Sequence, residues 1–126
     1  VMKVAGHRIA TAELENVLNE HKAVNESAVV PTPDALKGEV PVAFVVLNKV
    51  SPSEELEAEI KKHVDKTIGP IARPSKIYFV KDLPKTRSGK IMRRILKNIL
   101  KKEKPEGLMT LINPDCVEDI KKTVEN

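Results

Sequence analysis

The 126 residues suffice for one domain, and a composition of 40% hydrophobic and 32% charged residues excludes a disordered chain. Three aromatic residues, Phe44, Tyr78 and Phe79, argue against a surface that stacks the bases of single-stranded nucleic acid. The net charge of +4 is uneven, because residues 81–104 hold ten bases and two acids, so we expect an anionic partner to meet the chain at one place.

The N-terminal residues predict a hairpin and a helix. Residues 1–9 are expected to form two short strands joined by a tight turn at Gly6, a residue that tolerates the positive φ of such turns. Thr11 is expected to cap the helix that follows. Apolar or weakly polar side chains recur there at helical spacing and predict one core-facing stripe, at Leu14, Val17, Leu18 and His21.

The middle of the chain predicts two strands, a helix and a third strand. Residues 26–31 form a short apolar run, and residues 40–48 form a longer one that is typical of the centre of a sheet. The stretch Ser51-Pro52-Ser53-Glu54 matches a capping box with Pro at the first helical position. Residues 75–80 predict the third strand. The helix between them has an apolar stripe at Leu56, Ile60 and Val64.

Ser88 is expected to cap a last long helix whose apolar side chains, from Ile91 onward, face inward while its bases face solvent. The order of elements predicts an α+β fold, a small two-layer sandwich of an N-terminal β-hairpin and a three-stranded sheet with helices on one side. Residues 1–104 are expected to form this domain. Residues 105–126 are expected to form a C-terminal tail with a short helix that begins near Asn113-Pro114.

Lys90 follows Ser88-Gly89 at the expected start of that helix, where backbone N–H groups favour phosphate or carboxylate oxygens. The spacing of a phosphate-binding P-loop is absent. From the residues alone a solvated basic helix face is the favoured interpretation, with anion binding and charge-stabilising catalysis as alternatives. The chain offers too few catalytic groups for a complete site, so a catalytic role would deliver one residue to a site made by another domain.

Cysteine and histidine content limits other classes of function. The single Cys116 excludes an internal disulfide, suits a reducing cytoplasm and is interpreted as a small apolar filler. The three histidines lack metal-ligand spacing, so no metal site is expected. The apolar runs are too short to span a membrane, and no signal peptide opens the chain. Because the sequence starts within an expected strand, we expect a further segment upstream.

Two longer stretches resemble a known family. PKTRSGKIMRR (84–94) resembles the C-terminal signature of the adenylate-forming enzymes, which include acyl-CoA synthetases, peptide-synthetase adenylation domains and luciferases. KVAGHRIATAELENVL (3–18) resembles the hairpin and helix that open their C-terminal domain. Together with IGP before a strand and TLINPDCV in the tail, the resemblance covers essentially the whole chain and looks most like the acetyl-CoA synthetase branch.

The resemblance implies a mobile C-terminal lid on a larger N-terminal domain that binds ATP, as its Mg²⁺ complex, and a short-chain carboxylic acid. It implies that Lys90 is the adenylation lysine, which contacts α-phosphate and carboxylate oxygens as the acyl-adenylate forms. In the second half-reaction it implies that the hairpin replaces Lys90, with Gly6 lining the pantetheine channel and His7 and Arg8 facing CoA or the adenylate. It further implies that Lys90 is a target of a protein acetyltransferase and deacetylase.

The chain departs from the acetyl-CoA synthetase pattern in the helix before IGP. A base for the phosphates of CoA is expected there, but the stretch is Val64-Asp65-Lys66, which leaves Lys66 as the nearby candidate and Arg73 as a substitute. The family's hinge residue is expected just before Val1.

Two other classes of function stay open. The charge of residues 81–104 supports a stand-alone anion-binding or interaction module, for which salt would weaken binding steeply. A purely structural or dimerising domain is the third class. The family interpretation predicts no nucleic acid or membrane partner, no cofactor bound by the isolated chain, and no catalysis by it alone.

Overall fold

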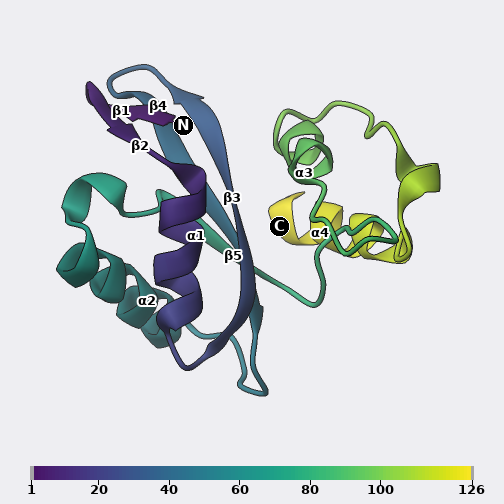
Figure 1. The fold of residues 1–126 in the computed structure, drawn as a ribbon, viewed down its shortest axis with the longest axis horizontal. Coiled ribbons are helices and arrows are strands. Elements are labelled where there is room, and N and C mark those ends of the chain that lie inside the picture. The colour runs from purple at the N-terminus through teal and green to yellow at the C-terminus, as the bar shows by residue number, and fades with distance from the viewer. Residues whose placement is uncertain (1, 126) are drawn as a thin grey trace.

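The computed structural model describes residues 2–125, which fold around one five-stranded sheet with helices on both faces (Figure 1). In Figure 1, α1 and α2 lie on one side of the sheet, and α3 and α4 lie on the other. The α+β class predicted from the sequence is confirmed.

The central strand of the sheet is β4 (Gly38–Leu47), which pairs with three other strands. β3 (Val24–Asp34) runs antiparallel to it along its whole length. The other edge of β4 pairs with β1 (Met2–Val4) at one end and, in parallel, with β5 (Lys76–Val80) further along. The N-terminal hairpin and the three longer strands therefore belong to one sheet.

β1 and β2 (His7–Ile9) form the predicted hairpin. Its turn residues, Ala5 and Gly6, have φ values of +50° and +84°, the left-handed pair of a type I′ turn. The Ala5 N–H donates to the Lys37 carbonyl at 2.8 Å, so the β3–β4 turn supports this one.

The first core lies between the sheet, α1 (Thr11–Glu20) and α2 (Glu54–Thr67), with a short 3₁₀ turn, η1 (Pro70–Ala72), after α2. The hairpin contributes Met2, Val4 and Ile9 to it. Most of the predicted apolar stripes of both helices is buried there, at Leu14, Val17, Leu18, Ile60 and Val64, while the predicted His21 and Leu56 are only partly buried.

The second core lies on the opposite face, under α3 (Arg93–Leu100), the 3₁₀ turn η2 (Leu108–Thr110) and α4 (Asp115–Glu125). Alternate residues of β4 serve the two cores, with Ala43 and Val45 in the first and Val42 and Phe44 in the second. The predicted two-layer sandwich with helices on one side is therefore wrong. Because β4 is apolar on both faces, the fold has three layers.

The predicted helix starts need correction. α1 follows Ala10, whose backbone is extended (φ −78°, ψ 131°), so Thr11 is already helical and caps nothing. α2 is capped by Ser53, whose Oγ accepts from the Leu56 N–H at 3.0 Å, and Pro52 lies before the cap. Ser88 caps no helix, since α3 begins only at Arg93.

Candidate functional site

Lys90 lies in a short hairpin that precedes α3, residues 84–92, called the Lys90 hairpin below. Its arms are joined by hydrogen bonds from the Thr86 N–H to the Lys90 carbonyl (3.0 Å) and from the Met92 N–H to the Pro84 carbonyl (2.8 Å). Gly89, at φ +87°, makes the turn, and its N–H donates to the Thr86 carbonyl. The predicted helix N-terminus at Lys90 is therefore wrong.

The Lys90 side chain is exposed, and no carboxylate among residues 2–125 pairs with its ammonium. The hairpin that carries it is anchored, because Pro84 is buried and Ile91 and Met92 pack against the second core. A cation on an anchored loop can be presented to an anion that lies outside this domain.

Two neighbouring bases of the 81–104 segment are held by acids from elsewhere in the chain. Arg93 donates through Nε and Nη2 to the two carboxylate oxygens of Glu15, at 2.7 and 2.5 Å, and these bonds raise the pKa of the guanidinium. The prediction that Arg93, like the other bases of its helix, faces solvent is therefore wrong. Lys85 donates to Glu26 at 2.7 Å, which raises the pKa of the lysine.

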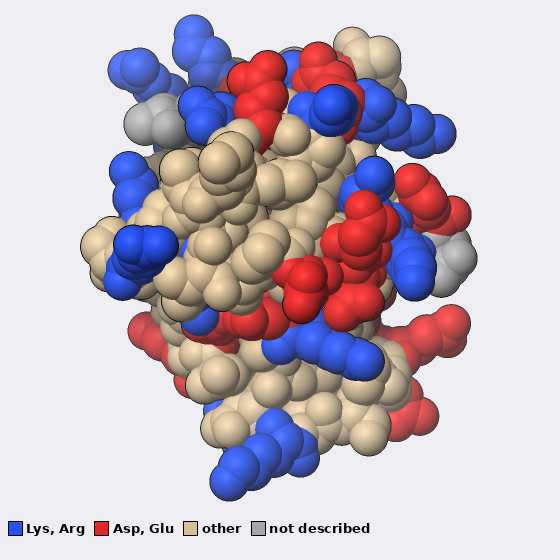
Figure 2. All heavy atoms as spheres, turned by 90° about the vertical axis from the view of Figure 1, so that its right-hand side faces the viewer, with Lys and Arg blue, Asp and Glu red and all other residues tan. Residues whose placement is uncertain are grey.

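The face that carries α3 and α4 shows no single basic stripe. In Figure 2, Lys and Arg atoms alternate with Asp and Glu atoms along the rim and in a band across the face, and an uncharged area lies above that band. The net charge of the 81–104 segment is partly offset by the ion pairs of Lys85 and Arg93 within the domain.

Gly6, His7 and Arg8 are exposed in the N-terminal hairpin. A Cβ added to Gly6 would meet nothing within 4 Å, so it is the positive φ and not crowding inside the domain that favours glycine. This hairpin packs on the first core and the Lys90 hairpin on the second, so the structure keeps the two hairpins apart, and the two signature stretches meet only through Glu15 and Arg93.

Lys66 is exposed in the last turn of α2, and its neighbour Asp65 is engaged. Arg73 donates to both carboxylate oxygens of Asp65, at 2.9 and 2.5 Å, and holds the pKa of that carboxyl below its ordinary value. The positive charge of Arg73 is thus offset within the domain. Lys66 has no such partner among the described residues.

Comparison with known proteins identifies the family. The family model for the C-terminal domain of AMP-binding enzymes matches residues 13–90, a range that includes Lys90 and excludes the N-terminal hairpin. The chain belongs to this family.

Relatives of this AMP-binding enzyme C-terminal domain match nearly the whole chain. The chain is 56% identical over 126 residues to the acetyl-coenzyme A synthetase of Pyrobaculum aerophilum, and the alignment covers 99% of this chain and 19% of that protein. It is 45% identical over 125 residues to the 3-hydroxypropionyl-coenzyme A synthetase of Metallosphaera sedula, covering 98% and 19%. The crystal structure of an acyl-CoA synthetase from Brucella canis aligns at 40% identity and a TM-score of 0.74, covering 80% and 19%. The chain spans about a fifth of the length of the curated relatives it matches.

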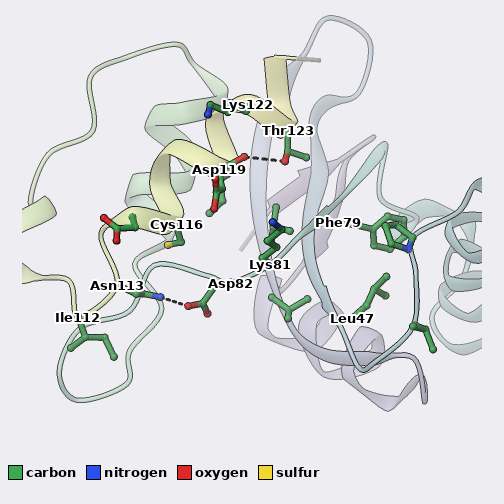
Figure 3. Close-up of a pocket in the computed structure, with 16 residues that line it drawn as sticks. Leu47, Phe79, Lys81, Asp82, Ile112, Asn113, Cys116, Asp119, Lys122 and Thr123 are labelled. Atoms are coloured by element: carbon green, nitrogen blue, oxygen red, sulfur yellow. Dashed lines mark hydrogen bonds between the residues drawn. The ribbon is translucent and has the colours of Figure 1, made fainter.

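The domain also has a groove at the ends of β4 and β5, beside α4 (Figure 3). It has a volume of about 890 Å³ and includes Asp82, Asn113 and Cys116, but none of the predicted site residues. Burial and the nearby acids Asp82 and Asp119 raise the pKa of the Cys116 thiol to about 11. Residues 2–125 contain no group of three or more side chains suited to hold a metal ion, and none of their helices could cross a membrane.

Two residues of this AMP-binding enzyme C-terminal domain support the site and were not predicted. Glu15 is buried on α1 and joins Arg93, and Asn113 contacts the chain that leads into the Lys90 hairpin. The sequence carries a weak signal for each, an acid beside Leu14 in an apolar stripe and the Asn-Pro pair before the terminal helix.

Proposed function

We propose that this domain is the mobile C-terminal part of an AMP-forming acyl-CoA synthetase of the acetyl-CoA synthetase type, and that Lys90 serves its adenylation half-reaction. The whole enzyme would use ATP, as its Mg²⁺ complex, a short-chain carboxylate and CoA. The observation that carries the proposal is the exposed, unpaired ammonium of Lys90 on an anchored hairpin, whose neighbours Lys85 and Arg93 are already ion-paired within residues 2–125.

In the first half-reaction a carboxylate oxygen attacks the α-phosphorus of ATP. An oxygen–phosphorus bond forms and the bond to pyrophosphate breaks, which gives the acyl-adenylate. The two reacting groups are both anions, so a cation placed between them offsets their repulsion and stabilises the charge of the transition state. The Lys90 ammonium is proposed to supply that charge to a site made by the rest of the enzyme.

In the second half-reaction the thiol sulfur of CoA attacks the acyl carbon, the bond from that carbon to the AMP oxygen breaks, and the thiol loses its proton. We propose that Gly6, His7 and Arg8 face the substrates in this step. The open space around Gly6 supports a role beside the pantetheine chain. Since the two hairpins pack on different cores, a rotation of the domain would exchange them at one site.

Further contacts complete the proposal. Lys66 would meet a phosphate of CoA, since Arg73 is already paired with Asp65. The exposure of Lys90 suits a protein acetyltransferase and deacetylase, and acetylation would remove the charge that adenylation needs. A cytoplasmic setting agrees with the free thiol of Cys116. The acid is selected elsewhere in the enzyme, and the isolated domain is inert.

The test uses the full-length enzyme and measures each half-reaction separately. Lys90→Ala should reduce acid-dependent pyrophosphate exchange by about 10²- to 10³-fold, the usual effect of removing one charge-stabilising group. Gly6→Leu should leave exchange intact and reduce the formation of acyl-CoA from supplied acyl-adenylate. Equal losses in both half-reactions for either variant would contradict the roles proposed here.

A further inference from the structure

The segment just before α4 is hydrogen-bonded to the first arm of the Lys90 hairpin. Thr86 and Leu111 form an isolated antiparallel bridge, and the Ile112 N–H donates to the Lys85 carbonyl at 2.9 Å. On its other side Lys85 lies opposite Ile91. The first arm of the hairpin is therefore held between its own second arm and residues 111–113.

Asn113 makes the side-chain contacts of this junction (Figure 3). Its Nδ2 donates to Asp82 Oδ2 and to the Leu83 carbonyl, each at 2.7 Å, and its Oδ1 accepts from the Lys85 N–H at 3.0 Å. Both amide hydrogens and the oxygen are thus used on residues 82–85. No other residue type of this size offers two donors and an acceptor in that arrangement.

Asn113 is itself fixed by the terminal helix. Its carbonyl accepts from the Cys116 N–H at 3.2 Å in the first turn of α4, and α4 buries Cys116, Val117 and Ile120 in the second core. On the other side of the junction, Thr86 donates from its N–H to the Lys90 carbonyl at 3.0 Å. A continuous series of contacts therefore leads from the second core through Asn113 and Thr86 to the backbone of Lys90.

We propose that Asn113 is a positioning residue for Lys90: its side-chain amide fixes the base of the Lys90 hairpin on α4, and so sets where the Lys90 ammonium stands during adenylation. The inference rests on the proposed role of Lys90. A long lysine side chain reaches a transition state reproducibly only from a fixed backbone, and a misplacement of about 1 Å can reduce a rate by about 10²-fold.

The experiment uses the full-length enzyme with four variants: Asn113→Asp, the exchange Asp82→Asn with Asn113→Asp, Met109→Ala and Lys90→Ala. Asn113→Asp removes the two donors and places a carboxylate against Asp82. The exchange restores an amide–carboxylate pair with its members swapped. Met109 lies four positions before Asn113, in η2, and is 99% exposed, so Met109→Ala is the control.

Asn113→Asp is expected to lower kcat of acid-dependent pyrophosphate exchange by about 10- to 100-fold with little change in KM for ATP. It should leave acyl-CoA formation from supplied acyl-adenylate unchanged. The exchange variant should recover part of the lost kcat, because it restores the pair with residue 82 but not the hydrogen bond to the Leu83 carbonyl. Met109→Ala should behave as the parent enzyme.

Two results would overturn the inference, and they differ from failure of the proposed function. If Lys90→Ala abolishes pyrophosphate exchange but Asn113→Asp does not lower it, Lys90 has its proposed role and Asn113 does not position it. If Asn113→Asp and the exchange variant lose both half-reactions equally, Asn113 only holds the domain together. If Lys90→Ala itself leaves exchange intact, the proposed function fails and the role of Asn113 with it.

Discussion

Glu15 on α1 binds Arg93 on α3 across the edge of the sheet. The two residues are 78 positions apart in sequence, and both carboxylate oxygens accept from the guanidinium. Glu15 Oε2 also accepts from the Val29 N–H of β3 at 2.8 Å. One buried carboxylate therefore joins the helix after the N-terminal hairpin to the helix after the Lys90 hairpin, and it satisfies a backbone group on the outer edge of β3.

Replacing Glu15 should destabilise the chain. Glu15→Gln removes the charge and one acceptor, so that the Val29 N–H and Arg93 compete for a single oxygen, and the expected loss in the free energy of unfolding is about 1–3 kcal/mol. Urea unfolding of this chain would measure the loss as a lower midpoint. Glu13→Gln, an exposed position on the same helix, is the control and should change the free energy by less than about 0.5 kcal/mol. Equal effects at the two positions would contradict the role of the Glu15 carboxylate in joining α1, β3 and α3.

The cap of α2 is testable with two serines that are two positions apart. Ser53→Ala should lower the free energy of unfolding by about 1 kcal/mol, because the Leu56 N–H loses its acceptor. Ser51→Ala should have almost no effect, since Ser51 lies outside the helix and is exposed. The urea midpoints of the two variants distinguish the two caps. A larger effect at Ser51 would show that Ser51 caps α2, as predicted from the sequence.

The Asp65–Arg73 pair should give a pH-dependent contribution to stability. Arg73 depresses the pKa of Asp65 in the folded state below its ordinary value of 3.8, so the stabilisation is complete above that value and is lost as the pH falls through the folded pKa. The stability of the parent chain relative to Asp65→Asn should therefore decline on acidification below about pH 4. Urea midpoints of both proteins across this range provide the measurement. A difference that does not vary with pH would show that the pair is not formed in solution.

Cys116 should react slowly with alkylating reagents. With a pKa of about 11, about one thiol in a thousand is ionised at pH 8. Alkylation by iodoacetamide, followed by mass spectrometry, should be slow in the folded protein and should accelerate with pH to above about pH 10. The same chain in urea should react at the rate of an ordinary thiol. Rapid alkylation of the folded protein at pH 8 would show that α4 does not bury Cys116 as described.

The sequence predicted the elements whose signals are local. The Ala5-Gly6 turn, the apolar stripes of α1 and α2 and the central position of β4 follow from periodicity and turn chemistry within a few residues. The layer arrangement was missed although the unbroken apolar run of β4 implied it, because one strand does not show which helices cover each face.

The local structure around the candidate site residues was predicted only in part. Lys90 was singled out by a motif, but it was placed at the start of a helix. The Ser-Gly pair before an apolar repeat is ambiguous, since it can cap a helix or form the turn of a hairpin that precedes one, as it does here. The partners of Arg93 and of Lys85, at 78 and 59 positions away, depend on how the sheet and helices assemble. Asn113 was missed for the same reason, since its partners at residues 82–85 lie about thirty positions earlier.

The most direct test of the central claim is the second half-reaction in the Lys90→Ala enzyme. Supplied with acyl-adenylate and CoA, the full-length variant should form acyl-CoA within about threefold of the parent rate, while its pyrophosphate exchange is reduced by about 10²-fold or more. That result would assign the exposed ammonium of Lys90 to adenylation alone. A loss of acyl-CoA formation as large as the loss of pyrophosphate exchange would contradict it.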